Sequence, residues 1–281
     1  MSLAGLGRRL SGRWRRGKGL LSHASVELLR ALGGERALRY ALHLREGRPG
    51  ASLARWESLR GQWSGRKVVL IGTGPSVNDV DWRRLEAGTV LCALNRAQTL
   101  AAKMGHTPDM VVMSDPTAMA DYGERETFGV GLVCLSTQAS RTSGFCPPDA
   151  VLFDQWLFPK MDRGFFQTDM ARPLYQSRSV AHAALQILVW MGCSEIICVG
   201  VDFTFAPSAP HFYPTHGKEA ARSGHLSVAN AESMAQAFVH ARRALERDGR
   251  VAVYNAGDPH GRNPFPYKPW DMCFPIRKEP A

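Results

Sequence analysis

The feature that most constrains this fold is the segment KVVLIGTGPS at residues 67–76, where an apolar run gives way to two closely spaced glycines. Four consecutive aliphatic residues are typical of a strand that is buried on both faces of a parallel sheet. Gly72 and Gly74 permit a tight turn and bring backbone N–H groups close to a ligand. A helix beginning near residues 76–79 would direct its positive end to the same place, where it would stabilise a nucleotide phosphate. The alternative is a purely structural strand–turn–helix, because the spacing is not G-x-G-x-x-G.

The rest of the chain alternates between strand and helix patterns. We predict further strands at residues 89–94, 110–114, 132–136, 151–153, 195–201 and 251–255, and helices at residues 80–86, 96–104, 178–191 and 228–247. This alternation predicts an α/β, Rossmann-like fold with a doubly wound, mainly parallel sheet. We place the catalytic domain at residues 65–260, after a basic helical appendage at residues 1–64 and before a C-terminal tail at residues 261–281.

Positive charge is concentrated near the N-terminus. Residues 1–67 contain 15 of the 35 Lys and Arg residues and only four Glu, so the remainder is nearly neutral. Residues 8–21 and 26–44 mix arginines with leucines at helical spacing, a pattern typical of segments that bind anionic membranes. The alternative is a solvated helix that packs on the domain through its leucines. We predict that residues 1–60 bind an anionic membrane surface and that the protein is cytoplasmic, peripheral at the inner face of the membrane.

Composition argues against several other classes of protein. No apolar run approaches the roughly 20 residues that span a bilayer, and the basic start lacks the pattern of a secretory signal. The six cysteines form no C-x-x-C pair, so we interpret them as reduced core thiols and expect no zinc site. The basic residues lack the regular aromatic interleaving of a base-stacking surface, so no nucleic acid partner is expected. A homo-oligomer is left open.

Polar side chains follow several of the predicted strands. Asn95, Asp115 and Asp202 each come at or just after a strand end, as the glycine turn does. Each of the three could simply cap a helix or fix its own loop. In a parallel sheet, however, the carboxyl ends of the strands meet at one edge, where ligands bind. The pattern therefore predicts a ligand cleft at this edge.

Four motifs in this order resemble one extended protein family. They are GTGPSVNDVDWRRL, LNRAQ, GHTPDMVVMSDP and RSVAHAALQILVWMGCSEIICVGVDF, and the similarity runs from about residue 67 to about residue 255. The family contains bacterial sialyltransferases that use CMP-sialic acid, motility accessory factor glycosyltransferases of flagellin, and archaeal-type hydroxymethyl-dihydropterin pyrophosphokinases. The resemblance implies a glycosyltransferase that moves a nonulosonic acid such as sialic acid from a CMP-activated donor. The acceptor would be a saccharide or a lipid-linked saccharide, and no cofactor would be required.

The resemblance also implies roles for individual residues. The residues that would bind the nucleotide and the donor are Gly72, Thr73, Gly74, Ser76, Asn95, Asp115 and Asp202. Asp115 departs from the family pattern, which has an asparagine there. Arg178 and Tyr213 would stabilise the leaving phosphate, and His225 would take the proton from the acceptor hydroxyl. His211 and His216 compete with His225 for this role. His182 lies on the predicted long helix, and we interpret it as a packed residue.

Two other functions remain open at this stage. A pyrophosphokinase would transfer diphosphate from ATP to a hydroxymethylpterin-like alcohol, with Asp115 and Asp202 as ligands of Mg²⁺. A non-catalytic protein would keep the nucleotide-binding fold and attach to the membrane surface.

Overall fold

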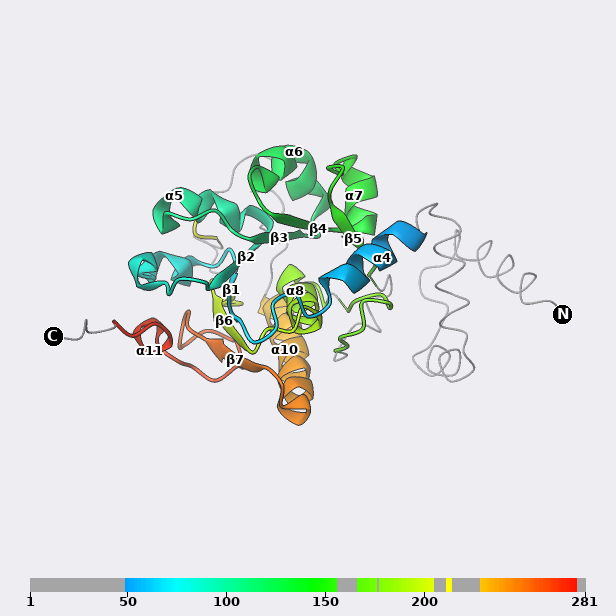
Figure 1. The fold of residues 1–281 in the computed structure, drawn as a ribbon. Coiled ribbons are helices and arrows are strands. Elements are labelled where there is room, and N and C mark those ends of the chain that lie inside the picture. Colours follow the sequence, from blue (N-terminus) through cyan, green and yellow to red (C-terminus); the bar gives the residue numbers. More distant parts are fainter. Residues whose placement is uncertain (1–48, 156–165, 176, 205–210, 214–227, 277–281) are drawn as a thin grey trace.

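A seven-stranded parallel sheet forms the centre of the computed structural model, which describes residues 49–155, 166–175, 177–204, 211–213 and 228–276 (Figure 1). The strands are β1 (Lys67–Ile71), β2 (Val90–Leu94), β3 (Met110–Met113), β4 (Leu132–Ser136), β5 (Val151–Phe153), β6 (Glu195–Val199) and β7 (Ala252–Asn255). Their order is β5-β4-β3-β2-β1-β6-β7, and every neighbouring pair is parallel. The predicted Rossmann-like, doubly wound fold is confirmed.

Strand β1 lies at the point where the direction of winding reverses. It pairs with β2 on one side and with β6 on the other, so that Val69 is in register with both Leu91 and Ile197. In open parallel sheets the ligand crevice forms outside the carboxyl ends of the strands at such a switch point. The glycines that follow β1 therefore sit where this topology favours ligand binding.

Helices cover both faces of the sheet (Figure 1). Helices α5 (Ala101–Met104), α6 (Pro116–Thr127) and α7 (Thr137–Ser143) cover one face, and α8 (Val180–Trp190) and α10 (Val228–Asp248) cover the other. Along β1, Val68 and Leu70 pack on the α8 side, whereas Val69 and Ile71 pack on the α5–α6 side. Because both faces of the strand are buried, β1 reads as a continuous apolar run.

One predicted helix is replaced by a shorter 3-10 turn, and another begins as a 3-10 helix. Residues 80–86 form only η2 (Trp82–Arg84), whose start is capped by the Asp81 side chain accepting from the Arg83 N–H. Residues 96–104 begin as η3 (Asn95–Leu100) and become α-helical only in α5. Short segments that bury a few residues against the sheet do not need a full amphipathic helix.

The predicted boundary at residue 64 does not separate two folded units. Helix α4 (Pro49–Leu59) lies within the predicted appendage, yet Trp56, Leu59 and Trp63 are buried in the core beneath α8. The Trp56 indole N–H donates to the Leu152 carbonyl at 2.8 Å, and the Trp190 indole N–H donates to the Trp56 carbonyl at 2.9 Å. The folded domain therefore includes α4, and residues 1–48 lie outside the described residues.

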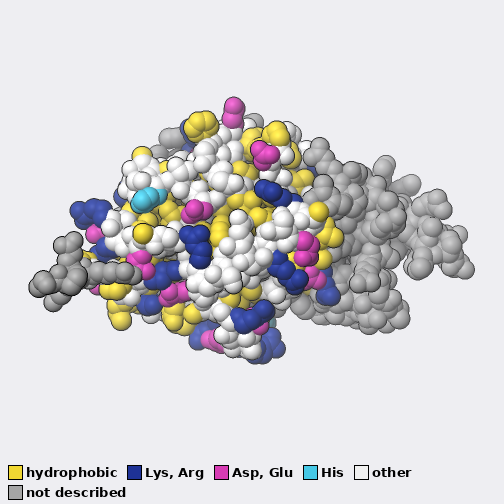
Figure 2. Space-filling model, in the orientation of Figure 1, with side chains coloured by type: hydrophobic (Ala, Val, Ile, Leu, Met, Phe, Trp, Pro, Cys, Tyr) yellow, Lys and Arg dark blue, Asp and Glu magenta, His cyan; other side chains and the backbone are white. Residues whose placement is uncertain are grey.

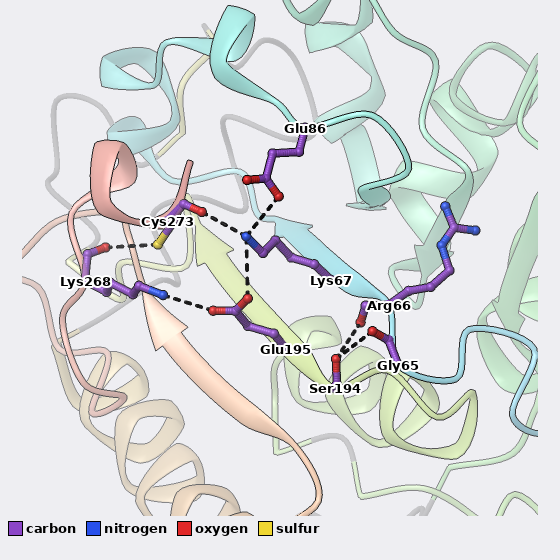
Figure 3. A network of polar contacts seen from close by, with 8 residues as sticks. All are labelled: Gly65, Arg66, Lys67, Glu86, Ser194, Glu195, Lys268 and Cys273. Atoms are coloured by element: carbon purple, nitrogen blue, oxygen red, sulfur yellow. Dashed lines mark hydrogen bonds and ion pairs between the residues drawn. The ribbon is translucent and has the colours of Figure 1, made fainter. Parts of the chain in front are cut away.

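Residues 261–276, which were predicted to be a C-terminal tail, also belong to the domain. The Lys67 ammonium, at the start of β1, donates to the Cys273 carbonyl at 2.9 Å and pairs with Glu86 and Glu195 at 3.3 and 3.6 Å (Figure 3). Glu195 also pairs with Lys268 at 3.1 Å. This network ties α11 (Trp270–Cys273) to the amino ends of β1 and β6.

The described surface carries mixed charge. Figure 2 shows basic and acidic side chains interspersed over one face of the described domain, as the near-neutral sequence after residue 67 predicts. Within the described residues, no helix combines the length and apolar character that crossing a bilayer would need. All six cysteines are free; five are buried, and Cys146 is exposed.

Candidate functional site

A cavity of about 470 Å³ opens at the carboxyl edge of the sheet. The segments that line it follow β1, β2, β3 and β6 or begin α8, and they are residues 72–75, 94–96, 114–118, 178–181 and 200–204. Tyr122, His211, Tyr213 and Met234 complete the wall. The predicted convergence of the strand ends on one cleft is therefore observed.

Backbone strain is concentrated at this cavity. Among the described residues, the non-glycine residues with positive φ are Asn95 (48°), Ser177 (49°), Arg178 (60°) and Phe203 (54°). Three of these line the cavity, and Ser177 precedes Arg178. Such conformations cost free energy and persist where the surrounding structure holds them, commonly at functional sites.

The glycine loop approaches β6 closely. The Gly72 N–H donates to the Val199 carbonyl at 2.8 Å, and the Gly74 N–H donates to the Gly200 carbonyl at 2.7 Å. A Cβ on Gly72 would overlap the Gly200 carbonyl oxygen, and one on Gly74 would overlap a carboxylate oxygen of Asp202. These two glycines thus serve a close backbone approach, and their N–H groups are already paired, contrary to our expectation that they would be open to a phosphate.

The helix predicted from residues 76–79 is instead a five-residue 3-10 turn, η1 (Pro75–Asp79). Ser76 within it does not line the cavity. Its hydroxyl donates to an Asp202 carboxylate oxygen at 2.5 Å, and its N–H donates to the other at 3.1 Å. Burial raises the pKa of Asp202, whereas the hydrogen bonds from Ser76 lower it. Asp202 borders the cavity and also fixes the loop after β1, rather than its own loop as the alternative interpretation had it.

Asn95 and Asp115 lie on the same wall but differ in their hydrogen bonding. Asp115 caps α6, because one carboxylate oxygen accepts from the N–H groups of Thr117 at 2.7 Å and Ala118 at 3.3 Å. The buried side-chain oxygen of Asn95 has no hydrogen-bond partner among the described residues. A buried acceptor of this kind is costly unless a ligand or water supplies the donor.

Two arginines bring positive charge to the cavity. Arg178 is exposed and begins the segment that leads into α8. Arg96 is the functional candidate that the sequence analysis missed, although it lies within the LNRAQ motif. Its guanidinium lies between the rings of Tyr122 and Tyr213, at 3.8 and 4.2 Å from their centroids. No signal in the sequence pairs these three residues.

Segment 211–213 contacts Thr73 of the glycine loop. The His211 Nδ1 lies 3.1 Å from the Thr73 hydroxyl, and the Phe212 N–H donates to the Thr73 carbonyl at 2.9 Å. The rings of His211 and Tyr213 are stacked, 5.2 Å apart and 9° from parallel. Predicted site residues from two parts of the chain are thus brought together, whereas His216 and His225 lie outside the described residues.

His182 is a packed residue, as predicted. Its side chain is fully buried, its Nδ1 lies 2.7 Å from the Tyr175 carbonyl, and burial lowers its pKa to about 4. Within the described part of the chain, no group of three or more His, Cys, Asp or Glu side chains is arranged to hold a metal ion.

Comparison with known proteins gives one family and several distant structures. Residues 50–208 match the model of the family described as 6-hydroxymethylpterin diphosphokinase MptE-like. No curated protein matches the chain.

Three solved structures are similar at low sequence identity. The sialyltransferase CstII from Campylobacter jejuni, in complex with CMP-3FNeuAc, is 17% identical, with a TM-score of 0.48 over 76% of this chain and 91% of that one. The α-2,3-sialyltransferase Cst-I from Campylobacter jejuni is 15% identical, with a TM-score of 0.49 over 72% and 80%. The MAf glycosyltransferase from Magnetospirillum magneticum AMB-1 is 18% identical, with a TM-score of 0.43 over 84% and 44%.

Proposed function

This chain belongs to the 6-hydroxymethylpterin diphosphokinase MptE-like family, and from that membership we propose that it is a transferase that uses a nucleotide-activated donor. The cavity at the switch point of the sheet would hold the donor. Its size falls within the range of small-molecule sites, and Arg178 gives it positive charge for a phosphate.

The donor that we propose is a CMP-activated sugar of the nonulosonic acid type. The observation that carries this choice is that both carboxylates beside the cavity have structural partners within the protein. Asp115 accepts from the backbone of α6, and Asp202 accepts from Ser76. Transfer of diphosphate relies on Mg²⁺ held by carboxylates, whereas a nucleoside monophosphate leaving group does not require a metal. The motif resemblance to bacterial sialyltransferases agrees with this donor.

In the proposed reaction, the bond between the anomeric carbon and the CMP phosphate oxygen breaks while the acceptor hydroxyl oxygen bonds to that carbon. Arg178 and Tyr213 would stabilise the charge that develops on the departing phosphate. The acceptor proton would pass to a histidine, for which we propose His225. His211 is the alternative that lies in the described cavity, and His216 is the other.

The family description itself favours a second candidate, a diphosphokinase that uses ATP and Mg²⁺. In that reaction Asp115 and Asp202 would bind the metal through carboxylate lone pairs other than those that accept from Thr117 and Ser76.

Calorimetric titration with CMP, CDP and ATP, each with and without Mg²⁺, separates the two candidates. We expect metal-independent binding of CMP, weakened about 10-fold to 100-fold in Arg178→Gln through loss of a charge-assisted hydrogen bond. Arg172→Gln is the matched control, because Arg172 pairs with Asp169 at 3.1 Å and does not line the cavity. Binding of ATP that requires Mg²⁺, without binding of CMP, would favour the diphosphokinase.

A further inference from the structure

Four side chains form a continuous stack along the cavity wall. The Arg96 guanidinium lies 3.8 Å from the centroid of Tyr122, on α6, and 4.2 Å from that of Tyr213. The Tyr213 ring stacks in turn on His211, whose Nδ1 is 3.1 Å from the Thr73 hydroxyl. The stack therefore runs from α6 across the cavity wall to the glycine loop.

Helix α6 supplies both a ring and a carboxyl group to Arg96, and burial raises the pKa of that carboxyl group to about 7. Glu126 lies one turn after Tyr122, is 1% exposed, and has a carboxylate oxygen 3.9 Å from the Arg96 Nε. A guanidinium is planar and delocalised, so it can stack on two aromatic faces while it pairs with a carboxylate at its edge. An ammonium group at this position could not reproduce that geometry.

We propose that Arg96 is a positioning residue, which joins Tyr213 to α6 and so holds segment 211–213 against Thr73 of the glycine loop. This role extends the proposed function, because Tyr213 would stabilise the departing phosphate and His211 is the alternative base. Arg96 would thus set the geometry of the leaving-group side of the site.

Hydrogen exchange of the Phe212 amide tests the positioning directly, because this N–H donates to the Thr73 carbonyl at 2.9 Å. In Arg96→Gln we expect exchange to accelerate about tenfold, as loss of a partly buried cation–π contact would predict. Arg125→Gln is the matched control. Arg125 pairs with the same carboxylate at 3.6 Å and lies 5.3 Å from the Tyr122 centroid, but it is 65% exposed. Unchanged exchange in folded Arg96→Gln would overturn the proposal.

A second pair of variants serves if Arg96→Gln fails to fold. Tyr122→Phe keeps the ring that stacks on Arg96, whereas Tyr122→Leu removes it. The proposal requires faster exchange of the Phe212 amide in the leucine variant alone, and equal rates in the two variants would contradict it.

The effect on the site is measured with CMP as the probe. We expect Arg96→Gln to bind CMP about tenfold more weakly than the wild type and Arg125→Gln to bind it equally well. If the wild type does not bind CMP, the proposed function fails, and the exchange rates still decide whether Arg96 positions the segment. If the wild type binds CMP and Arg96→Gln binds it equally well, the role in the site is refuted.

Discussion

The His182 ring is fully buried against Phe166 and Phe238, and this burial lowers its pKa from 6.5 to about 4. In the unfolded chain the same ring binds a proton near pH 6.5. The unfolded state therefore binds more protons between pH 6.5 and 4, and stability is lost as the pH falls through this interval. We expect the wild type to lose about 1.4 kcal/mol per pH unit more than His182→Gln does.

Urea unfolding of both proteins at several pH values between 7 and 5 measures this difference. His182→Gln is the appropriate comparison, because an amide can still donate to the Tyr175 carbonyl but does not titrate. Parallel pH profiles of the two proteins would show that His182 does not control the acid stability.

At the level of elements, the contact between the ends of β1 and β6 depends on Gly200. Gly200 has a φ of 66°, and a Cβ there would lie 2.9 Å from the Gly72 carbonyl oxygen. Gly249 has a φ of 68°, and nothing lies within 4 Å of its Cβ position. Both alanine variants incur the left-handed strain of about 1–2 kcal/mol, but only Gly200→Ala adds a clash between two strand ends. We expect Gly200→Ala to be less stable than Gly249→Ala by about 1–3 kcal/mol in denaturant unfolding, and equal losses would contradict this account.

The strands could be predicted from the sequence because each is a short apolar run that both faces of the sheet bury. The predicted spans of β4 and β5 agree with the structure residue for residue. The short segments after β1 and β2 could not be predicted as 3-10 turns, because hydrophobic spacing alone does not separate them from α-helices. Helix α4 was included in the basic appendage although it contains one Arg and one Glu, and its buried Trp56 belongs to the core.

The position of the candidate site could be predicted from the sequence, but only some of its side-chain contacts could. The strand ends brought Asn95, Asp115 and Asp202 to one edge, since parallel topology dictates this. The pairing of Ser76 with Asp202 spans 126 residues, and the stacking of Arg96 on Tyr213 spans a similar distance along the chain. Such long-range side-chain contacts leave no periodic pattern in a single sequence.

At the level of the whole molecule, most of the excess positive charge lies outside the part of the chain that the structure describes. The family match begins at residue 50, and α4 is already part of the core. Residues 1–48 contain 11 Lys and Arg against three Glu. Binding to an anionic membrane surface, if it occurs through this segment, should therefore be separable from folding.

Deleting residues 1–48 tests this separation. The deletion retains Trp56, so we expect the thermal midpoint to stay within a few degrees of that of the full chain, whereas deletion of residues 1–64 should destabilise the domain severely.

Co-sedimentation with phosphatidylserine vesicles should be lost when residues 1–48 are deleted. It should be weakened for the full chain at about 0.5 M salt, because screening removes electrostatic attraction. Binding that persists after deletion of residues 1–48 would instead assign membrane attachment to the folded domain. If vesicle binding by the full chain does not change with salt concentration, apolar contacts and not the arginines hold the protein to the vesicle.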